Sequence, residues 1–319
     1  MFLVIHKRGE TMNYISVAEA AGKWGISTRR VRILCRENRI EGVKLKGKSY
    51  KIPENAPKPA DGRAFNHMEI SDEFSALFMN IETKKAELAR RRPLTQGELS
   101  RLHEEFLIEY TFNSNAIEGN TLTLRETAIV LSGITIDKKP LKEHLEAVGH
   151  RDAFLFVEQL VKENAKFSES VIKQIHSLVL MDRLEDRGVY RRIPVTIMGA
   201  SHEPVQPYLI APRMEELIHK YAGYKKTMHI IERVARFHLE FEGIHPFIDG
   251  NGRTGRLLLN LELMQNGYLP IDVKFADRRK YYDAFDSYHR NNDAGSMIRL
   301  VAGYVEERLN LFLQMTEWG

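Results

Sequence analysis

The chain has 319 residues, 43% of them hydrophobic, which is enough to bury a sizeable core and suggests one large and one small domain. Its single cysteine, Cys35, excludes an internal disulfide framework, and we expect it to pack in a core. No stretch approaches the ~20 apolar residues of a transmembrane helix, and the four apolar residues 2–5 are too few for a secretory signal. We therefore expect a cytoplasmic chain with no membrane partner.

The net charge of +4 is unevenly distributed along the chain. Residues 1–63 hold 14 Lys and Arg against 6 Asp and Glu, a net of +8. The remaining 256 residues hold 33 against 37, a net of −4. A basic N-terminal segment of this kind is the electrostatic footprint of a domain that meets phosphate groups.

Two helices are predicted in this basic segment. The first runs from Val17 to Trp24 after Ser16, which is suited to an N-cap, and residues 25–27 form a turn. The second runs from about Thr28 to Asn38. Its apolar stripe is Val31, Leu34 and Cys35, and its basic face is Arg29, Arg32 and Arg36. Such a helix can pack against a core and face phosphate at the same time.

The alternation of residues 43–46 and 49–52 predicts two short strands, joined by a hairpin turn at Gly47-Lys48. The order helix, turn, basic helix, wing resembles the winged helix-turn-helix modules of the excisionase and MerR-like type, over residues 13–53. The resemblance implies a DNA-binding domain at residues 1–60, with protein docking or a merely soluble basic domain as alternatives. The candidate DNA contacts are Arg29, Arg30, Arg32, Arg36, Lys46 and Lys48.

Prolines at 53, 57 and 59 mark a linker, so we place the domain boundary near residue 60. Beyond it, apolar residues recur at spacings of three and four, which predicts a mainly α helical bundle over residues 61–319. His176 and His238 lie on or beside these stripes and are expected to be packed histidines. The stripes are Val171, Ile172, Ile175, Leu178 and Val179; Met214, Leu217, Ile218 and Tyr221; and Ile231, Val234, Ala235, His238 and Phe241.

Residues 245–256 read His-Pro-Phe-Ile-Asp-Gly-Asn-Gly-Arg-Thr-Gly-Arg. The glycines permit a tight turn with exposed N–H groups, and the apolar residues 257–263 predict a buried helix whose N-terminus suits phosphate. Arg253 and Arg256 are three residues apart, so both project from one helix face toward the same anion. His245 is a candidate general base, and Asp249 can hold Mg²⁺ together with phosphate oxygens and water.

This string matches, without a departure, the signature His-Pro-Phe-x-Asp-Gly-Asn-Gly-Arg-x-x-Arg, and on it the chain resembles the Fic family. Most members transfer AMP from ATP to a hydroxyl side chain of a target protein. The resemblance implies that His245 takes the proton from that hydroxyl, that Asp249 holds Mg²⁺, and that Arg256 grips the γ-phosphate. The implied ATP-binding residues of this segment are Gly250, Asn251, Gly252, Arg253, Thr254, Gly255 and Arg256.

A second segment, Ser114-Asn115-Ala116-Ile117-Glu118-Gly119, resembles the Ser/Thr-x-x-x-Glu-Gly/Asn inhibitory motif of one Fic class. Gly119 suits the position after a helix, so a helix near residues 110–119 would carry Glu118 in its last turn. The helix dipole disfavours a carboxylate there by ~0.3–1 kcal/mol, and the acid needs a cationic partner. The resemblance supplies Arg256 as that partner and implies that the pair blocks the γ-phosphate; a solvated helix end is the alternative. The inhibitory residues are Ser114, Glu118 and Gly119.

Two weaker matches complete the implied site. A β-rich segment resembles the flap hairpin that aligns the target by main-chain pairing, and its residues are Thr196, Ile197, Met198 and Gly199. Tyr281 and Tyr282 resemble the aromatic pair that lines the adenine pocket, although either tyrosine could equally be a core residue.

The resemblances together imply a Fic-type helical bundle with a β-hairpin flap, joined to a small winged helix-turn-helix domain. The implied function is an autoinhibited protein adenylyltransferase that uses ATP and Mg²⁺ and modifies a protein hydroxyl, the chain itself included. Removal of AMP by the same site, or transfer of another phosphate-linked group, is one alternative. A nucleotide-sensing, DNA-binding transcriptional regulator is another, and a homodimer is among the open oligomeric states.

Overall fold

The computed structural model describes residues 13–36, 40, 42–47, 49–57, 73–197 and 202–316. The chain divides into two compact units, Met1–Met68 and Glu69–Gly319. Each unit has hydrophobic clusters of its own. Within the described ranges, no helix combines the length and the apolar character that crossing a bilayer requires.

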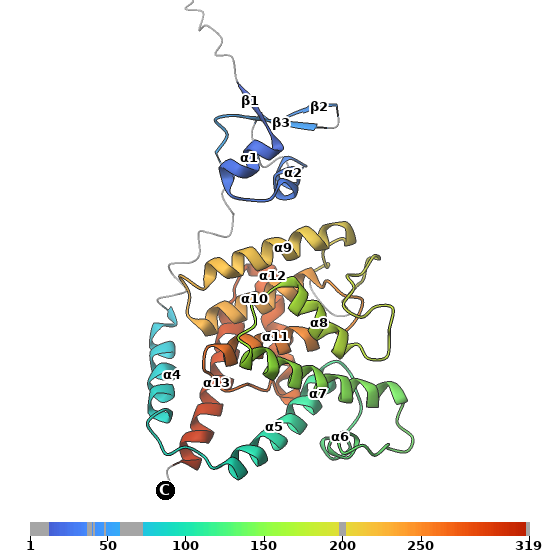
Figure 1. Ribbon diagram of the computed structural model, residues 1–319, viewed down its shortest axis with the longest axis vertical. Helices are drawn as coiled ribbons and strands as arrows, with labels where there is room; N and C mark the ends of the chain where they lie inside the picture. The colour runs from blue at the N-terminus through green and yellow to red at the C-terminus, as the bar shows by residue number, and fades with distance from the viewer. Residues whose placement is uncertain are drawn as a thin grey trace, which may run out of the picture. The chain divides into compact units, whose positions relative to one another are not determined.

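The first unit contains a three-stranded antiparallel sheet with the strand order β1-β3-β2 (Figure 1). Both predicted helices and both predicted hairpin strands are confirmed. β1 was not predicted, because a three-residue strand shows too little periodicity and is defined only by its pairing with β3. The elements are β1 (Tyr14–Ser16), α1 (Val17–Trp24), α2 (Thr28–Arg36), β2 (Lys44–Lys46) and β3 (Ser49–Pro53).

Local capping sets the start of α1. The Ser16 hydroxyl accepts a hydrogen bond from the Glu19 N–H at 3.2 Å, and the Glu19 carboxylate accepts one from the Ser16 N–H at 2.7 Å. This reciprocal pair is a capping box, which satisfies two backbone donors that a helix start leaves free. The predicted N-cap role of Ser16 is confirmed.

The two faces expected of the second helix are present on α2. Val31, Leu34 and Cys35 are buried in the core of the unit, together with Trp24 and Ile52. Among the candidate DNA contacts, the exposed ones are Arg29, Arg32, Arg36 and Lys46, and Arg30 is half-buried. Lys48 lies outside the described residues, as do residues 37–39 at the predicted end of this helix.

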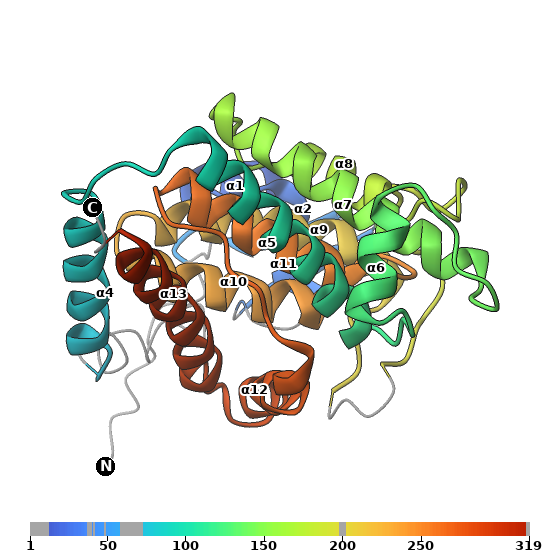
Figure 2. The same cartoon turned by 90° about the horizontal axis from the view of Figure 1, so that it is seen from below.

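Within the described residues, the regular elements of the second unit are α-helices and one 3-10 turn, which confirms the mainly α prediction (Figures 1 and 2). Its first helices are α4 (Ser75–Leu88), α5 (Gln96–Ile117), α6 (Leu124–Leu131), α7 (Leu141–Lys162) and α8 (Glu169–Val179). The following elements are α9 (Pro207–Tyr224), α10 (Ile230–Ile244), α11 (Asn251–Gln265), η2 (Phe275–Asp277), α12 (Arg278–Asn291) and α13 (Gly295–Met315).

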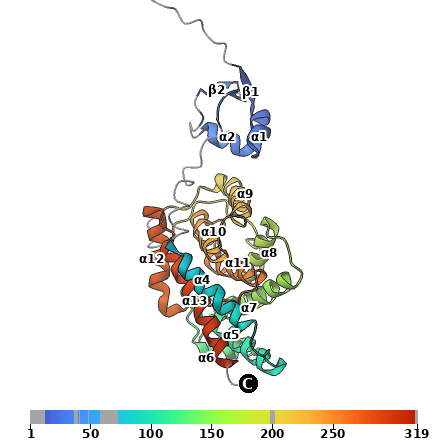
Figure 3. The same ribbon diagram turned by 90° about the vertical axis from the view of Figure 1, so that its left-hand side faces the viewer.

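Helix α11 lies inside the bundle, in contact with α5, α7, α8 and α10 (Figure 3). Helices α10 and α11 lie between two hydrophobic clusters and contribute side chains to both. Leu259 and Leu263 face one cluster, and Leu257, Leu258 and Leu261 face the other. A helix that is apolar on several sides is buried, so the prediction of a buried helix behind the glycine-rich turn is confirmed.

Replacing Leu261 by Ala should lower the free energy of unfolding by about 2–5 kcal/mol, because the side chain is fully buried and its loss leaves a cavity. Leu155→Ala, at a 41% exposed position on α7, is the matched control and should cost less than about 1 kcal/mol. Urea titration followed by circular dichroism measures both. Equal losses in the two variants would contradict the placement of α11 in the core.

Candidate active site

The candidate base, His245, directly follows α10 in a left-handed backbone conformation, with φ 50° and ψ 62°. This conformation is unfavourable for a residue other than glycine, so the surroundings must hold it. Arg191 does so: its Nε donates to the His245 carbonyl at 2.7 Å, and its backbone N–H donates to the Pro246 carbonyl at 3.0 Å. The cation also lies at the C-terminal end of α10, where the helix dipole favours positive charge.

One nitrogen of the His245 ring is turned toward a carboxylate. Nδ1 lies 3.5 Å from Oε2 of Glu242, one helical turn earlier on α10. Glu242 is buried, so its charge acts on the ring with little screening by water. This arrangement leaves Nε2 as the nitrogen that can take a proton from a substrate.

The turn after His245 is held by the side chain of Asn251. Its Oδ1 accepts from the Phe247 N–H and its Nδ2 donates to the Phe247 carbonyl, each at 2.9 Å. The Phe247 ring is fully buried and stacks on His176 at 3.6 Å between ring centroids. Asn251 therefore contributes to the site through the shape of the turn, and only its backbone is left to meet a phosphate.

His176 joins this turn to the segment that begins at Gly188. Nδ1 of His176 accepts from the Gly188 N–H at 2.9 Å, so the ring proton is on Nε2, which donates to the Asp249 carbonyl at 3.0 Å. Burial lowers the pKa of His176 to about 4, which keeps the ring neutral near pH 7. The expectation of a packed histidine agrees with this complete burial.

Asp249 lies at the mouth of the site beside three cations. Its Oδ1 accepts from the Gly250 N–H at 2.6 Å and from Nη2 of Arg253 at 3.2 Å. Oδ2 faces Arg183 at 3.6 Å and Lys142 at 3.9 Å. Burial disfavours the charged form, but these donors and cations outweigh it and lower the pKa of the carboxyl.

The described residues contain no cluster of three or more His, Cys, Asp or Glu side chains able to hold a metal ion. A site with one protein ligand suits Mg²⁺, which keeps several waters and takes further oxygen ligands from phosphates. Oδ2 of Asp249 is the available hard oxygen, because Oδ1 is already occupied by two donors. The residues present therefore fit Mg²⁺ only when a bound phosphate supplies further oxygen ligands.

Arg253 is almost completely buried, with 2% of its surface exposed. Its guanidinium lies 3.4 Å from Glu146 and 3.2 Å from Asp249. Its Nε and Nη1 form no hydrogen bond to any of the residues described. A buried cation with unused donors at the N-terminus of α11 is suited to bind an anion.

Arg256 is held by four acceptors and is equally buried. Nε donates to Oγ of Ser114 at 3.0 Å, and Nη2 donates to the Ser114 carbonyl at 2.7 Å. Nη2 also donates to Oε1 of Glu118 at 2.8 Å, and Nη1 donates to the Tyr281 hydroxyl at 3.2 Å. Burial disfavours the charge on Arg256, but contact with Tyr281 and Glu118 raises its pKa.

The end of α5 places Glu118 against the glycine-rich turn. Gly119 has φ 95° and follows the helix, where its N–H donates to the Ala116 carbonyl and the N–H of Asn120 donates to the Asn115 carbonyl. This is a Schellman motif, and the predicted position of Gly119 after the helix is confirmed. A Cβ atom on Gly252 would overlap Oε1 of Glu118, so the glycine lets the carboxylate approach the turn this closely.

Other predicted site residues lie deeper in the fold. Thr254 is fully buried, and a Cβ on Gly255 would lie 2.7 Å from the His238 ring, so Gly255 serves the close packing of α10 on α11. Tyr281 is buried, and its hydroxyl lies 2.6 Å from Nε2 of His238 and accepts from Nη1 of Arg256. Tyr282 is 47% exposed and donates to the Ile117 carbonyl at 2.8 Å, at the end of α5.

The predicted flap falls partly outside the described residues, which exclude Met198 and Gly199. Thr196 is exposed and Ile197 is half-buried, and the described residues 189–197 form no strand. A hairpin needs a partner strand to define it, and this segment has none within the described part of the chain. The assignment of these residues to a flap hairpin stays a prediction.

Residues 166–263 match the family described as Fic/DOC family. Two curated relatives named protein adenylyltransferase Fic are similar to this chain: one from Drosophila yakuba, 33% identical over 228 residues, and one from Culex quinquefasciatus, 32% identical over 246 residues. These matches cover 70% and 75% of this chain but 45% and 48% of the relatives. The chain thus spans less than half the length of these relatives.

Two solved structures share the fold. A Fic domain containing signaling protein from Bacteroides thetaiotaomicron has a TM-score of 0.67 at 25% identity, covering 76% of this chain and 97% of that one. Fic-1 from C. elegans has a TM-score of 0.67 at 29% identity, covering 77% of this chain and 73% of that one. Together with the family match over residues 166–263, these structures show that the second unit has the fold of Fic structures.

Arg191, Glu242 and His176 were not assigned to the site from the sequence. Arg191 and Glu242 lie outside the signature, and no periodic pattern distinguishes a buried arginine that caps a helix from an exposed one. His176 was noted only as a packed histidine. The burial of all three, read from the structure, is the signal that reveals their roles.

Replacing Asn251 by Ala should lower the free energy of unfolding by about 2–4 kcal/mol, because it leaves the buried N–H and carbonyl of Phe247 without partners. Asn266→Ala is the matched control, since the Asn266 side chain donates to the Glu262 carbonyl at an exposed helix end and its loss should cost about 0.5 kcal/mol. Chemical denaturation compares the two. A loss no greater for Asn251 would show that the turn holds its shape without this side chain.

Proposed function

We propose that this chain is a protein adenylyltransferase that transfers AMP from ATP to a protein hydroxyl and is restrained by Glu118. The observation that carries the proposal is the ion pair of Glu118 with Arg256. The carboxylate oxygen of this pair lies against the backbone of Gly252. The names of the relatives support the reaction class.

In the proposed reaction, Nε2 of His245 takes the proton of the target hydroxyl as that oxygen attacks the α-phosphorus and pyrophosphate leaves. Glu242 stabilises the resulting imidazolium from the Nδ1 side, and Arg191 holds the backbone that orients the ring. The N–H groups at the start of α11 and the unused donors of Arg253 bind the phosphates. Mg²⁺ on Asp249 would neutralise phosphate charge when bound.

Restraint follows from two effects of the Glu118 carboxylate. It takes up a donor of Arg256 that a γ-phosphate would otherwise use. It also places a negative charge against Gly252, where an incoming phosphate would be repelled. Tyr282 donates to the Ile117 carbonyl and so ties α12 to the end of α5 that carries Glu118.

Glu118→Gly should increase self-labelling by ATP carrying radioactive α-phosphate by about tenfold or more, since each ~1.4 kcal/mol of restraint removed corresponds to a factor of ten. His245→Ala in the Glu118→Gly background should abolish the labelling, because no other group at this position accepts the proton. Glu105→Gly changes an exposed glutamate on the same helix that pairs with Arg101; it controls for damage to α5 and should label like the wild type. Equal labelling of all four proteins would refute the proposal.

We infer a second function, DNA binding by the first unit, from the side chains exposed on it. Arg29, Arg32 and Arg36 point to solvent from α2, whose opposite face is buried. Lys44 and Lys46 are exposed on the neighbouring hairpin. A helix and a wing that both carry unburied positive charge are suited to contact duplex phosphates.

The triple change Arg29, Arg32 and Arg36 to Ala should weaken binding of the full chain to duplex DNA at low salt. Because each phosphate contact adds about −0.9 to the slope of log K against log salt, the slope should become shallower by up to about 3. Fluorescence anisotropy at several salt concentrations measures it. The control variant replaces three exposed cations of the second unit by Ala: Arg101, Lys280 and Arg290. An equal effect of both triple variants on DNA binding would show a general effect of net charge and contradict the proposal.

A further inference from the structure

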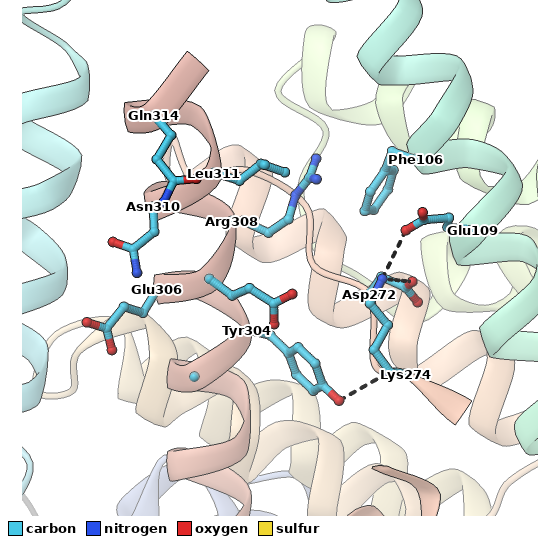
Figure 4. A pocket seen from close by; sticks show the side chains of 12 residues that line it. Phe106, Glu109, Asp272, Lys274, Tyr304, Glu306, Arg308, Asn310, Leu311 and Gln314 are labelled. Carbon is cyan, nitrogen blue, oxygen red and sulfur yellow. Dashed lines mark hydrogen bonds and ion pairs between the residues drawn. The ribbon is translucent and has the colours of Figure 1, made fainter. Parts of the chain in front are cut away.

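A pocket of about 460 Å³ opens between α13, α5 and the extended segment that contains Asp272 and Lys274 (Figure 4). Phe106 and Glu109 of α5 line one side, and Tyr304, Arg308 and Leu311 of α13 line the other. None of the predicted site residues lines it. Its volume lies within the ~300–1,000 Å³ of typical small-molecule sites.

The pocket contains a buried acceptor with unused capacity. Asp272 is 4% exposed, and its Oδ2 accepts from Asn113 Nδ2 at 2.6 Å and from Lys274 Nζ at 2.9 Å. Its Oδ1 has no hydrogen-bond partner among the described residues. An unpaired buried oxygen of this kind is unfavourable, so a donor bound in the pocket would be stabilised by it.

The pocket also contains a buried donor without a partner. Nε of Arg308 forms no hydrogen bond to the part of the chain that the structure describes. Its guanidinium lies over the rings of Phe106 and Phe312, with 4.8 and 5.2 Å to the centroids. Burial lowers the pKa of Arg308, and the nearby carboxylates of Asp272, Glu109 and Glu307 offset this only in part.

These two unpaired groups require opposite partners, an ammonium-type donor for Asp272 and a carboxylate-type acceptor for Arg308. A simple anion would meet the negative charges of Glu109, Asp272 and Glu307 near Arg308. A simple amine would leave the Arg308 donor unpaired. We propose that the pocket binds a small zwitterion of the free amino acid type, with its ammonium on Asp272, its carboxylate on Arg308 and an apolar side chain against Phe106 and Leu311.

Asn113 connects this pocket to the Arg256 network. Its Nδ2 donates to Asp272, and its Oδ1 accepts from the Phe275 N–H at 3.0 Å. Ser114, the next residue of α5, provides two of the four acceptors of Arg256. A bound ammonium keeps Asp272 ionised, which strengthens its bond to Asn113 and holds α5 on Arg256. The zwitterion therefore favours the restrained state; this last step rests on the proposed function, whereas the binding itself does not.

Binding should depend on pH through Asp272. Burial raises the pKa of its carboxyl to about 6, against the opposing effect of Lys274 and Asn113. Glu109 of α5 and Tyr304 and Arg308 of α13 are the other polar groups that face it. Only the ionised form receives the ammonium, and at pH 5 about one carboxyl in eleven is ionised, so affinity should be about tenfold weaker at pH 5 than at pH 7.

Isothermal titration calorimetry on the full chain tests the binding, with leucine and arginine as zwitterionic probes. Leucinamide, which lacks the carboxylate, and acetate, which lacks the ammonium, should bind at least tenfold more weakly than leucine. Arg308→Met should weaken leucine at least tenfold and leave leucinamide unchanged. Arg299→Met, on the same helix but paired with Glu73 outside the pocket, is the matched control and should bind leucine like the wild type.

Asp272→Asn should also weaken leucine tenfold and remove the difference between pH 5 and pH 7, with circular dichroism used to show that each protein is folded. If Asp272→Asn does not fold, two measurements still test the proposed ligand: leucine binding by Arg308→Met, and leucine binding by the wild type at pH 5 and pH 7. Equal affinity for leucine and leucinamide, or no heat from any probe, would overturn the proposed ligand. A non-hydrolysable ATP analogue should bind about tenfold more weakly when leucine is saturating; leucine binding without this shift would overturn the coupling alone.

Discussion

The second unit is organised around a constraint at Arg256, whose guanidinium is almost fully buried and must still satisfy its donors. Removing such a cation from water costs several kcal/mol unless acceptors replace the solvent. Those acceptors come from α5, through Ser114 and Glu118, and from α12, through Tyr281. One side chain of α11 thus connects two other helices to the core of the unit.

The loop between α10 and α11 is strained, and contacts from other segments hold it in place. His245 has an unfavourable backbone conformation, and the loop after it turns so tightly that its main-chain groups need partners from elsewhere. Arg191, Asn251 and His176 provide them from three different segments. Because each is buried, the support is rigid, and the proposed base and phosphate-binding groups are positioned before any ligand arrives.

Helix α5 takes part in both sites discussed for the second unit. Glu118 at its C-terminal end meets the glycine-rich turn, and Asn113, just over one turn earlier, meets Asp272 beside the pocket. A rigid helix transmits a small displacement along its length with little loss, since its backbone hydrogen bonds resist local deformation. The inhibitory role and the pocket are separate proposals, yet they depend on the position of the same helix.

The sequence by itself determined the helical class, the two helices and the hairpin of the first unit, and the placement of Gly119 after a helix, because these depend on local spacing and backbone preference. The signature also located the residues around His245. Only the tertiary structure decided that Tyr281 is a core residue, that Gly255 serves helix packing, and that Arg191 and Glu242 support His245. Those roles arise from contacts between segments distant in sequence, and burial by another segment leaves no local pattern to read.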